Sequence, residues 1–494
     1  MTNARWLGGI ALTVLVAATA PGAARAASPP LATEGPWGTT LDLEVFDRLR
    51  GEFVRWFEPP STSATPNNRY DFLQNKFQLG LRLAREPYEA FFQFQDSTLA
   101  EVPANAVGVG ATYRANTNRS LQNGAFLRSG WVRTGRLFGV DGLFVKAGRQ
   151  LYSDGFDAPA ENPTLRWLQQ WRISQRLIGP FDYTAVGRSF DGGEIGWDGS
   201  WVNVTGFGFR PTYGGFEVDA NRELDITLAG LSLNLKEAAG GLSPWLAHTI
   251  ASLAVYYYGD DRDVLFLDNR PLAARRATQG KPVRLYTVGA NAARVEPLGP
   301  GFVDGLAYGY GQGGDWQGQV QRAWAYGVEA GYRLPALWAA PWLRVGVNSA
   351  SGDTNPRDDR HETFFQMLPT AWLYAQFPFY NMMNDQDVFA QAILDPHPRA
   401  TVRADVHWLR VNSSHDLVYA GGGATKNDFF GYSGLPTAGR NELAYLVNML
   451  LTVRLTSFLS LNVLYAHAFG QGVIRANAAG TGGDYGFAET VLAF

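Results

Sequence analysis

The stretch that decides the fold is residues 322–352, RAWAYGVEAGYRLPALWAAPWLRVGVNSASG. In its first half, aromatic and aliphatic residues alternate with glycine and charged residues, so that Trp324 and Val328 share one face while Glu329 and Arg333 share the other. This period-2 alternation predicts a β-strand. The alternation resumes after a short connection bounded by two prolines. The stretch therefore predicts a β-hairpin with one apolar face and one charged, glycine-rich face.

Runs of about ten residues with the same alternation recur along the chain, and this is the length that a tilted strand needs to cross a bilayer. The connections between them alternate between short turns and long links, which predicts a closed barrel with both termini at the short-turn end. The predicted strands are 41–53, 77–83, 89–95, 124–134, 143–150, 191–197, 201–209, 224–235, 248–258, 283–294, 302–312, 324–334, 343–348, 387–394, 400–410, 441–455, 459–470 and 484–494.

Composition agrees with a membrane barrel. The 494 residues are 46% hydrophobic and only 18% charged, with a net charge of -3, 56 Gly and no Cys. The net charge gives no indication of nucleic-acid binding, and the lack of Cys excludes disulfides. Residues 1–26 combine a basic start, a short apolar core and the small-residue site Ala24-Arg25-Ala26, which predicts a cleaved secretory signal peptide. Beyond it, no apolar run is long enough for a transmembrane helix.

We therefore predict an all-β protein: one antiparallel outer-membrane β-barrel domain, residues 27–494, with about eighteen strands, short periplasmic turns and long extracellular loops. The faces opposite the lipid then line a lumen. The positive residues expected there are Arg48, Arg50, Arg82, Arg333, Arg344, Arg403 and Arg454, joined by Lys146, and the acidic ones are Glu44, Glu89, Glu194, Glu329 and Asp405. Two interpretations stay open: an electropositive conduit for an anionic solute, or charges that pair across the lumen and keep it wet.

Catalytic and metal-binding motifs are weak. Residues 309–314 fit a dinucleotide fingerprint by letter, but they lie where a predicted strand ends and open no helix. The six His are scattered, and Ser414 beside His415 in a loop is not a triad. The loop 353–359 has oxygen ligands at calcium-like spacing but lacks the EF-hand glycine and final Glu, so we predict a solvated loop. We expect no enzyme activity and no cofactor.

Three short motifs in order resemble the alginate export family. They are Gly148-Arg149-Gln150, then Gly187-Arg188-Ser189-Phe190-Asp191-Gly192, and last Ser351-Gly352-Asp353 with Asn355-Pro356, Thr363-Phe364 and Leu368-Pro369-Thr370. The segment 377–384 has no counterpart in the family pattern that we can place.

The resemblance implies an eighteen-stranded outer-membrane channel for passive export of an anionic, alginate-like exopolysaccharide, with arginines in a selective constriction. Carried over by position, Arg149 and Arg188 join the expected lumen residues. Strict alternation from Leu143 places Arg149 on the lipid side, so a lumen position requires a bulge near Gly148. The expected partners are an anionic polysaccharide, the lipid bilayer with lipopolysaccharide, and periplasmic export proteins, for a monomer. A general or small-solute porin is the alternative.

Overall fold

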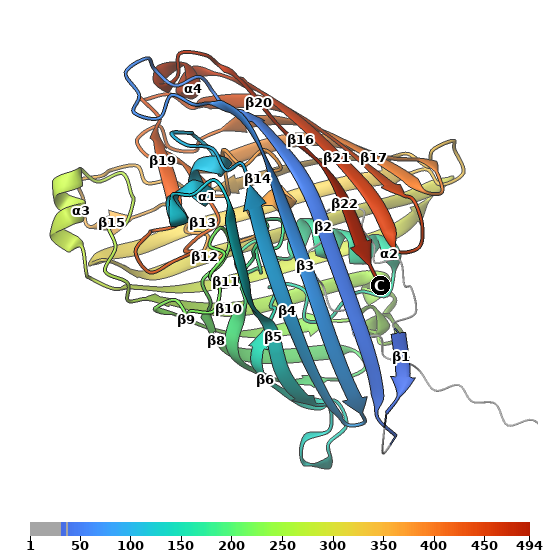
Figure 1. Cartoon of the computed structure of the whole chain (residues 1–494). Coiled ribbons are helices and arrows are strands. Elements are labelled where there is room, and N and C mark those ends of the chain that lie inside the picture. The colour runs from blue at the N-terminus through green and yellow to red at the C-terminus, as the bar shows by residue number, and fades with distance from the viewer. Residues whose placement is uncertain (1–30, 36–37) are drawn as a thin grey trace, which may run out of the picture.

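The computed structural model describes residues 31–35 and 38–494. The predicted signal peptide, residues 1–26, lies outside the described residues. Within the described part, one sheet holds twenty strands, of which β1 (Leu31–Glu34) and β15 (Arg360–His361) are short additions, which leaves eighteen in the barrel. The barrel strands are antiparallel and follow one another in sequence, and β2 pairs with both β3 and β22, which closes the ring (Figure 1).

The predicted eighteen-stranded barrel is confirmed, and most strands extend beyond their predicted bounds. The strands are β2 (Thr40–Arg55), β3 (Arg69–Arg85), β4 (Tyr88–Ala100), β5 (Gln122–Thr134), β6 (Leu143–Gln150), β7 (Phe190–Asp198), β8 (Val202–Pro211), β9 (Ile226–Leu235), β10 (Thr249–Asp260), β11 (Val283–Leu298), β12 (Gly301–Trp316), β13 (Gln319–Arg333), β14 (Trp342–Ala350), β16 (Asp385–His397), β17 (Ala400–Arg410), β20 (Glu442–Arg454), β21 (Leu459–Gly470) and β22 (Gly482–Ala493).

Closure satisfies the backbone of the first and last strands. The N–H of Val45 donates to the carbonyl of Phe494 over 2.7 Å, and the N–H of Phe494 donates back over 3.0 Å. A closed ring leaves no unpaired edge, which is the condition for β structure in lipid. The outward faces carry large exposed apolar side chains, among them Leu49, Val345 and Met449, whereas the inward faces carry buried polar ones.

The two ends of the barrel differ as predicted. Short turns such as Glu86-Pro87 lie at one end together with the C-terminus, and the long links 151–189, 351–384 and 411–441 lie at the other. Figure 1 shows α1, α3 and α4 at the long-link end and β1 near the C-terminus. Two connections depart from the pattern: β12 and β13 are joined at the long-link end by a tight turn of only Gln317 and Gly318, and β9 and β10 are joined at the short-turn end by the longer link 236–248.

The remaining elements are short. No helix among the described residues has the length and apolar character to cross a membrane. The strands β18 and β19 form a separate two-stranded sheet within the link 411–441. These elements are α1 (Val109–Thr117), α2 (Pro163–Leu168), α3 (Leu272–Thr278), α4 (Gly472–Asn477), the π-helical turn η3 (Gln169–Ile173), the 3₁₀ helices η2 (Leu137–Gly139), η4 (Glu237–Gly241), η5 (Pro244–Leu246) and η6 (Ala371–Leu373), and the strands β18 (Leu417–Gly421) and β19 (Tyr432–Pro436).

Candidate functional site

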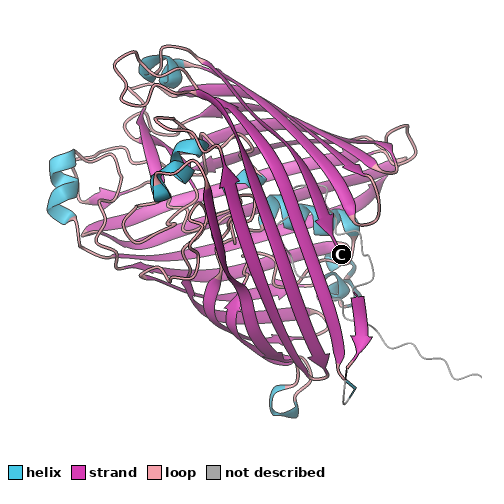
Figure 2. Cartoon of the chain, in the orientation of Figure 1, coloured by secondary structure: helices cyan, strands magenta, loops and turns pink. Residues whose placement is uncertain are grey.

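Two links fold into the lumen, and we call residues 151–189 the first inner segment and residues 362–384 the second inner segment. Every residue from 171 to 190 is buried, as are nearly all residues of the second inner segment. A parallel bridge between Ile178 and Leu368 joins the two. In Figure 2 loop segments cross the interior between the front and rear walls of the barrel. The middle of the lumen is therefore occupied by the chain itself.

Asp182 of the first inner segment is held by two cations of the barrel wall. Its Oδ1 accepts from Arg128 Nη2 over 2.6 Å and from Lys76 Nζ over 3.1 Å. All three side chains are buried. Burial alone would raise the pKa of the Asp182 carboxyl, but Arg128 and Lys76 hold the pKa below its ordinary value. The inner segment is thus fastened to the wall by a buried, charge-assisted contact.

Arg48 and Arg50 also fasten this part of the segment. Arg48 Nη2 donates to the Thr184 carbonyl over 2.6 Å, and Arg50 Nη1 donates to the Tyr183 carbonyl over 2.8 Å. Both arginines also approach Glu489 of β22, at 3.8 Å and 2.7 Å. They point into the lumen as expected, but both are buried against the chain and are not open to a solute.

Glu329 lies at the centre of a second cluster. Arg172 of η3 binds its carboxylate in a bidentate manner, with nitrogen to oxygen distances of 2.7 and 2.9 Å. Arg344 Nη2 donates to the other side of the carboxylate over 2.9 Å and also pairs with Asp304. Arg176 Nη2 lies 3.8 Å from Glu329 Oε1. One wall carboxylate therefore holds two arginines of the first inner segment and one of the wall.

Sequence reasoning missed Arg172, Arg176 and Asp182, because they lie in an irregular link where no alternation assigns a face. Arg176 sits between the rings of Tyr308 and Tyr374, with its guanidinium carbon 4.4 and 4.9 Å from their centroids. Its Nη2 has no hydrogen-bond partner among the described residues. The sequence feature that could have located them is the density of arginines in this link, because a loop exposed outside the barrel has no structural need for so many.

Arg188, carried over from the family motif, is also engaged by the chain. It is fully buried, and its Nη2 donates to the Gly422 carbonyl over 2.5 Å while Nη1 donates to the Ala424 carbonyl over 3.5 Å. Its guanidinium carbon lies 5.0 Å from the centroid of the Phe181 ring. Arg188 joins the first inner segment to the link 411–441 and is not part of the barrel wall.

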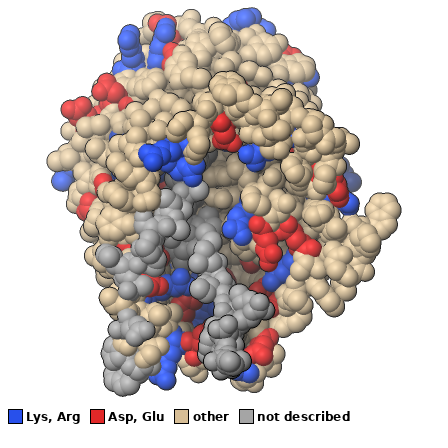
Figure 3. Space-filling model, turned by 90° about the vertical axis from the view of Figure 1, so that its right-hand side faces the viewer, with Lys and Arg blue, Asp and Glu red and all other residues tan. Residues whose placement is uncertain are grey.

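A cavity of about 400 Å³ opens at the short-turn end, and we call it the vestibule. Its acidic lining residues are Glu161 and Asp395, and Trp167 and Trp342 supply aromatic rings with centroids 4.7 Å apart. Viewed from this end, the molecule is hollowed at its centre, and charged side chains gather round the hollow (Figure 3). The basic lining residues are Arg166, Arg333, Arg399, Arg403 and Arg454.

Three of the five vestibule arginines, Arg166, Arg399 and Arg454, form no ion pair among the described residues. Arg333 pairs with Asp395 over 3.2 Å, and Arg403 pairs with Asp405 over 3.0 Å. Arg399 and Arg454, by contrast, make side-chain hydrogen bonds only to backbone carbonyls among the described residues, and both are exposed. Five arginines against two lining carboxylates leave this cavity electropositive. Arg333, Arg403 and Arg454 were among the expected lumen residues, whereas Arg166 and Arg399 were not foreseen.

Four further predicted lumen residues form two ion pairs within the wall. Arg82 Nη2 lies 2.6 Å from Glu89 Oε1 of the next strand. Glu194 lies 3.8 Å from Lys146, its register partner on β6. Both pairs are half-buried. They fit the interpretation that part of the lumen charge is structural.

Arg149 corrects the sequence expectation. It faces outward, because its register partners Gly130 and Asp191 lie on the outer faces of β5 and β7. Arg149 binds Asp191 in a bidentate manner, over 2.7 and 2.6 Å. Strict alternation was correct here, and the bulge invoked near Gly148 does not turn the side chain inward. Two residues of the family motifs thus form an ion pair on the outer wall.

Removing this outer pair should affect stability and not conduction. We expect Arg149→Met and Asp191→Asn each to destabilise the barrel, with a coupling of about 1 kcal/mol between them, because the pair is bidentate but not fully buried. A double-mutant cycle of urea unfolding in detergent micelles measures that coupling. A changed ion selectivity in either variant would contradict the outward position.

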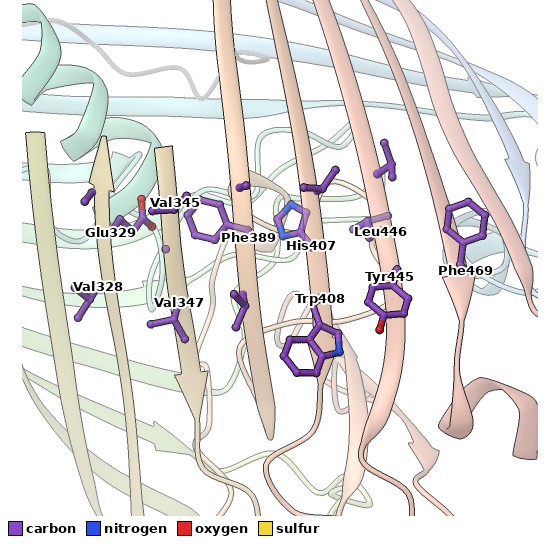
Figure 4. A pocket seen from close by; sticks show the side chains of 16 residues that line it. Val328, Glu329, Val345, Val347, Phe389, His407, Trp408, Tyr445, Leu446 and Phe469 are labelled. Carbon is purple, nitrogen blue, oxygen red and sulfur yellow. The ribbon is translucent and has the colours of Figure 1, made fainter. Parts of the chain in front are cut away.

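Another hollow lies outside the lumen. It measures about 840 Å³ and is lined mostly by outward side chains of neighbouring strands from β13 to β21, including Val345, Trp408 and Tyr445 (Figure 4). These side chains are exposed and apolar. The hollow is therefore part of the lipid-facing wall and not of the conduit.

The loop 353–359 differs from the predicted solvated loop at one residue. Asp353 is buried, and its backbone N–H donates to Asp416 Oδ2 over 2.9 Å. Most of the following residues are exposed, as expected. Within residues 31–35 and 38–494, no group of three or more His, Asp or Glu is placed to hold a metal ion.

Comparison with known proteins gives the family. The alginate export family model matches residues 61–483. Comparison with curated proteins finds no match. Among solved structures, Pseudomonas aeruginosa OccK9 (OpdG) aligns with a TM-score of 0.56 at 10% identity, over 92% of this chain and 99% of that one.

Two other Pseudomonas aeruginosa structures share this fold. OpdK with vanillate has a TM-score of 0.56 at 8% identity, and OccK2 (OpdF) in complex with glucuronate has 0.54 at 9% identity. Each covers 92% of this chain and 98% of the other chain. These are outer-membrane barrels of porin type, and at such low identity they establish the fold alone. The family match over most of the sequence, together with the eighteen-stranded barrel, shows that this chain is an outer-membrane protein and belongs to the alginate export family.

Proposed function

We propose that this outer-membrane channel exports an anionic polysaccharide of uronate type passively, with the chain entering through the vestibule. The observation that carries the proposal is the excess of arginine over carboxylate there, with Arg399 and Arg454 free to bind a solute. A guanidinium presents paired donors that match a carboxylate, and it stays charged at any relevant pH. Trp167 and Trp342 add apolar ring faces beside these charges, which suits a sugar that carries a carboxylate.

The second part of the proposal concerns the two inner segments. The first inner segment supplies Trp167 to the vestibule lining and Arg172 to Glu329, and every residue from 171 to 190 is buried, so the chain itself fills the lumen beyond the vestibule. Passage of a polymer then requires the inner segments to shift. We expect a monomer, seated in lipid and lipopolysaccharide, that receives its substrate from periplasmic export proteins.

Reversing two vestibule charges tests the proposal. We expect Arg399→Glu/Arg454→Glu to reduce the anion preference of the channel in planar bilayers, because two positive groups at the mouth become negative. Block of the current by uronate oligomers added from the periplasmic side should weaken at least about tenfold, since the loss of even one charge-assisted contact costs about 1.5 kcal/mol.

Arg357→Glu is the matched control, because Arg357 is exposed on a link at the opposite end. It should leave both measurements unchanged. Unaltered selectivity in the vestibule variant, or an equal loss in the control, would contradict a role for the vestibule.

A channel for small anionic solutes is the second candidate. Two barrels of the same fold were solved with vanillate and with glucuronate, which are small carboxylates. Oligomer length separates the two functions. Liposomes containing the protein should release uronate oligomers of many units for an exporter, but only the monomer and shortest oligomers for a small-solute porin.

A further inference from the structure

A second cavity lies at the extracellular end of the lumen, and we call it the outer hollow. It measures about 300 Å³. Residues from six separate links meet around it, including Thr112, Phe181, Tyr183, Trp372 and Phe429. Its size is that of a small ligand site.

The outer hollow differs from the vestibule in charge. Among the described residues that line it, none is Asp, Glu, Lys, Arg or His. Aromatic and small residues make up most of the lining, and Thr112, Thr425 and Ser433 supply hydroxyls. In a lumen otherwise rich in arginine and carboxylate, this makes a neutral, amphipathic surface.

The aromatic groups are held in place by packing. Tyr183 and Trp372 stack with centroids 6.0 Å apart and planes at 10°. Trp372 is supported from the barrel wall by Phe487, whose centroid is 6.1 Å away. Trp372 Nε1 is buried without a hydrogen-bond partner among the described residues, and Phe429 is 38% exposed. The site therefore combines rings that are fixed by packing with a partly exposed ring at its rim.

We propose that the outer hollow binds an uncharged pyranose ring of a saccharide. The C–H face of such a ring is apolar and can be buried against aromatic and small side chains, while its hydroxyls can donate to the oxygens of Thr112, Thr425 and Ser433, each of which already donates its own hydrogen to the chain. A carboxylate would find no cation in this lining. The class of ligand rests on the proposed polysaccharide export, and the site adds recognition of neutral sugar units to recognition of charge at the vestibule.

The test uses the full-length protein in detergent micelles and cellohexaose as the neutral probe, with binding measured by calorimetry at low and high salt. The wild type should bind cellohexaose with an affinity that salt does not change, because no ion pair contributes. Ala111→Trp, which fills the hollow from α1, and Phe429→Ala, which removes a ring at the rim, should each weaken binding about tenfold.

Two controls separate this site from others. Trp338→Ala removes an exposed indole in the turn between β13 and β14 and should bind like the wild type. Arg399→Glu/Arg454→Glu should also keep its cellohexaose affinity while losing uronate block. No binding by the wild type, or unchanged binding by both Ala111→Trp and Phe429→Ala, overturns the outer-hollow proposal. Because uronate block is measured separately, that failure would leave the proposed function standing.

Discussion

Replacing Glu329 with alanine should release the first inner segment from the wall and raise the single-channel conductance several-fold. Glu329 is 2% exposed and is the shared partner of Arg172 and Arg344. Without it, three buried arginines, including Arg176, lose their shared carboxylate, and among the described residues Arg344 alone of the three keeps an ion pair, with Asp304. Removing one partner of a buried ion pair costs about 3–5 kcal/mol, which shifts a seated-to-released equilibrium about a hundredfold or more.

The barrel itself should survive this change, because its ladder of strand pairs does not depend on the Glu329 side chain. Glu329→Gln keeps hydrogen-bond acceptance but loses the charge, so an intermediate conductance is expected. Glu194→Ala is the matched control, since the ion pair of Glu194 is with Lys146 of the neighbouring strand. Planar-bilayer recordings measure all three. A Glu329→Ala channel with wild-type conductance would show that this cluster does not hold the segment.

Replacing Asp182 with asparagine should also loosen the first inner segment, at a different place. The change leaves Lys76 and Arg128 buried without a carboxylate, although Arg48 and Arg50 still hold the neighbouring carbonyls. We therefore expect more frequent openings than in the wild type but a smaller effect than for Glu329→Ala. Adding Lys76→Met should restore part of the closed state, because it removes one of the two unpaired cations.

The Asp182 contact also has a defined pH dependence. Because the pKa of Asp182 in the folded protein lies below its ordinary value, the contact stabilises the closed state above that ordinary value and is lost as the pH falls through the lowered pKa. As far as the Asp182 contact determines it, the closed-state lifetime of the channel should stay constant from neutral to mildly acidic pH and shorten only in strong acid. Wild-type openings that increase between pH 7 and pH 5 would have to come from another group.

The barrel could be predicted from the sequence because the alternation of apolar and polar side chains has a direct physical cause. A strand between lipid and water must alternate, so Trp324, Val328 and Glu329 were assigned to the correct faces without any structure. The same rule placed Arg149 on the outer face, whereas the resemblance to a family motif implied a position in the lumen. Here the local pattern was the better guide, because Asp191 supplies its partner on the outer face.

The two inner segments could not be predicted, because irregular backbone has no period that assigns its side chains to a face. Arg172 and Asp182 lie in a link that alternation treats as a loop outside the barrel. Alternation alone could not give the face of Arg128 either: a register shift pairs Gln93 with Ser129 and Phe94 with Leu127, so Arg128 is the extra residue and turns inward to meet Asp182. The sequence therefore identified many of the lumen arginines, but it did not indicate which of them already bind other groups of the chain.

The most direct test of the central claim is the current through the wild-type protein in a planar bilayer under a salt gradient, with uronate oligomers then added from the periplasmic side. The account predicts a reversal potential whose sign indicates anion preference and a current that the oligomers block. A cation-preferring channel whose current the oligomers leave unchanged would contradict it.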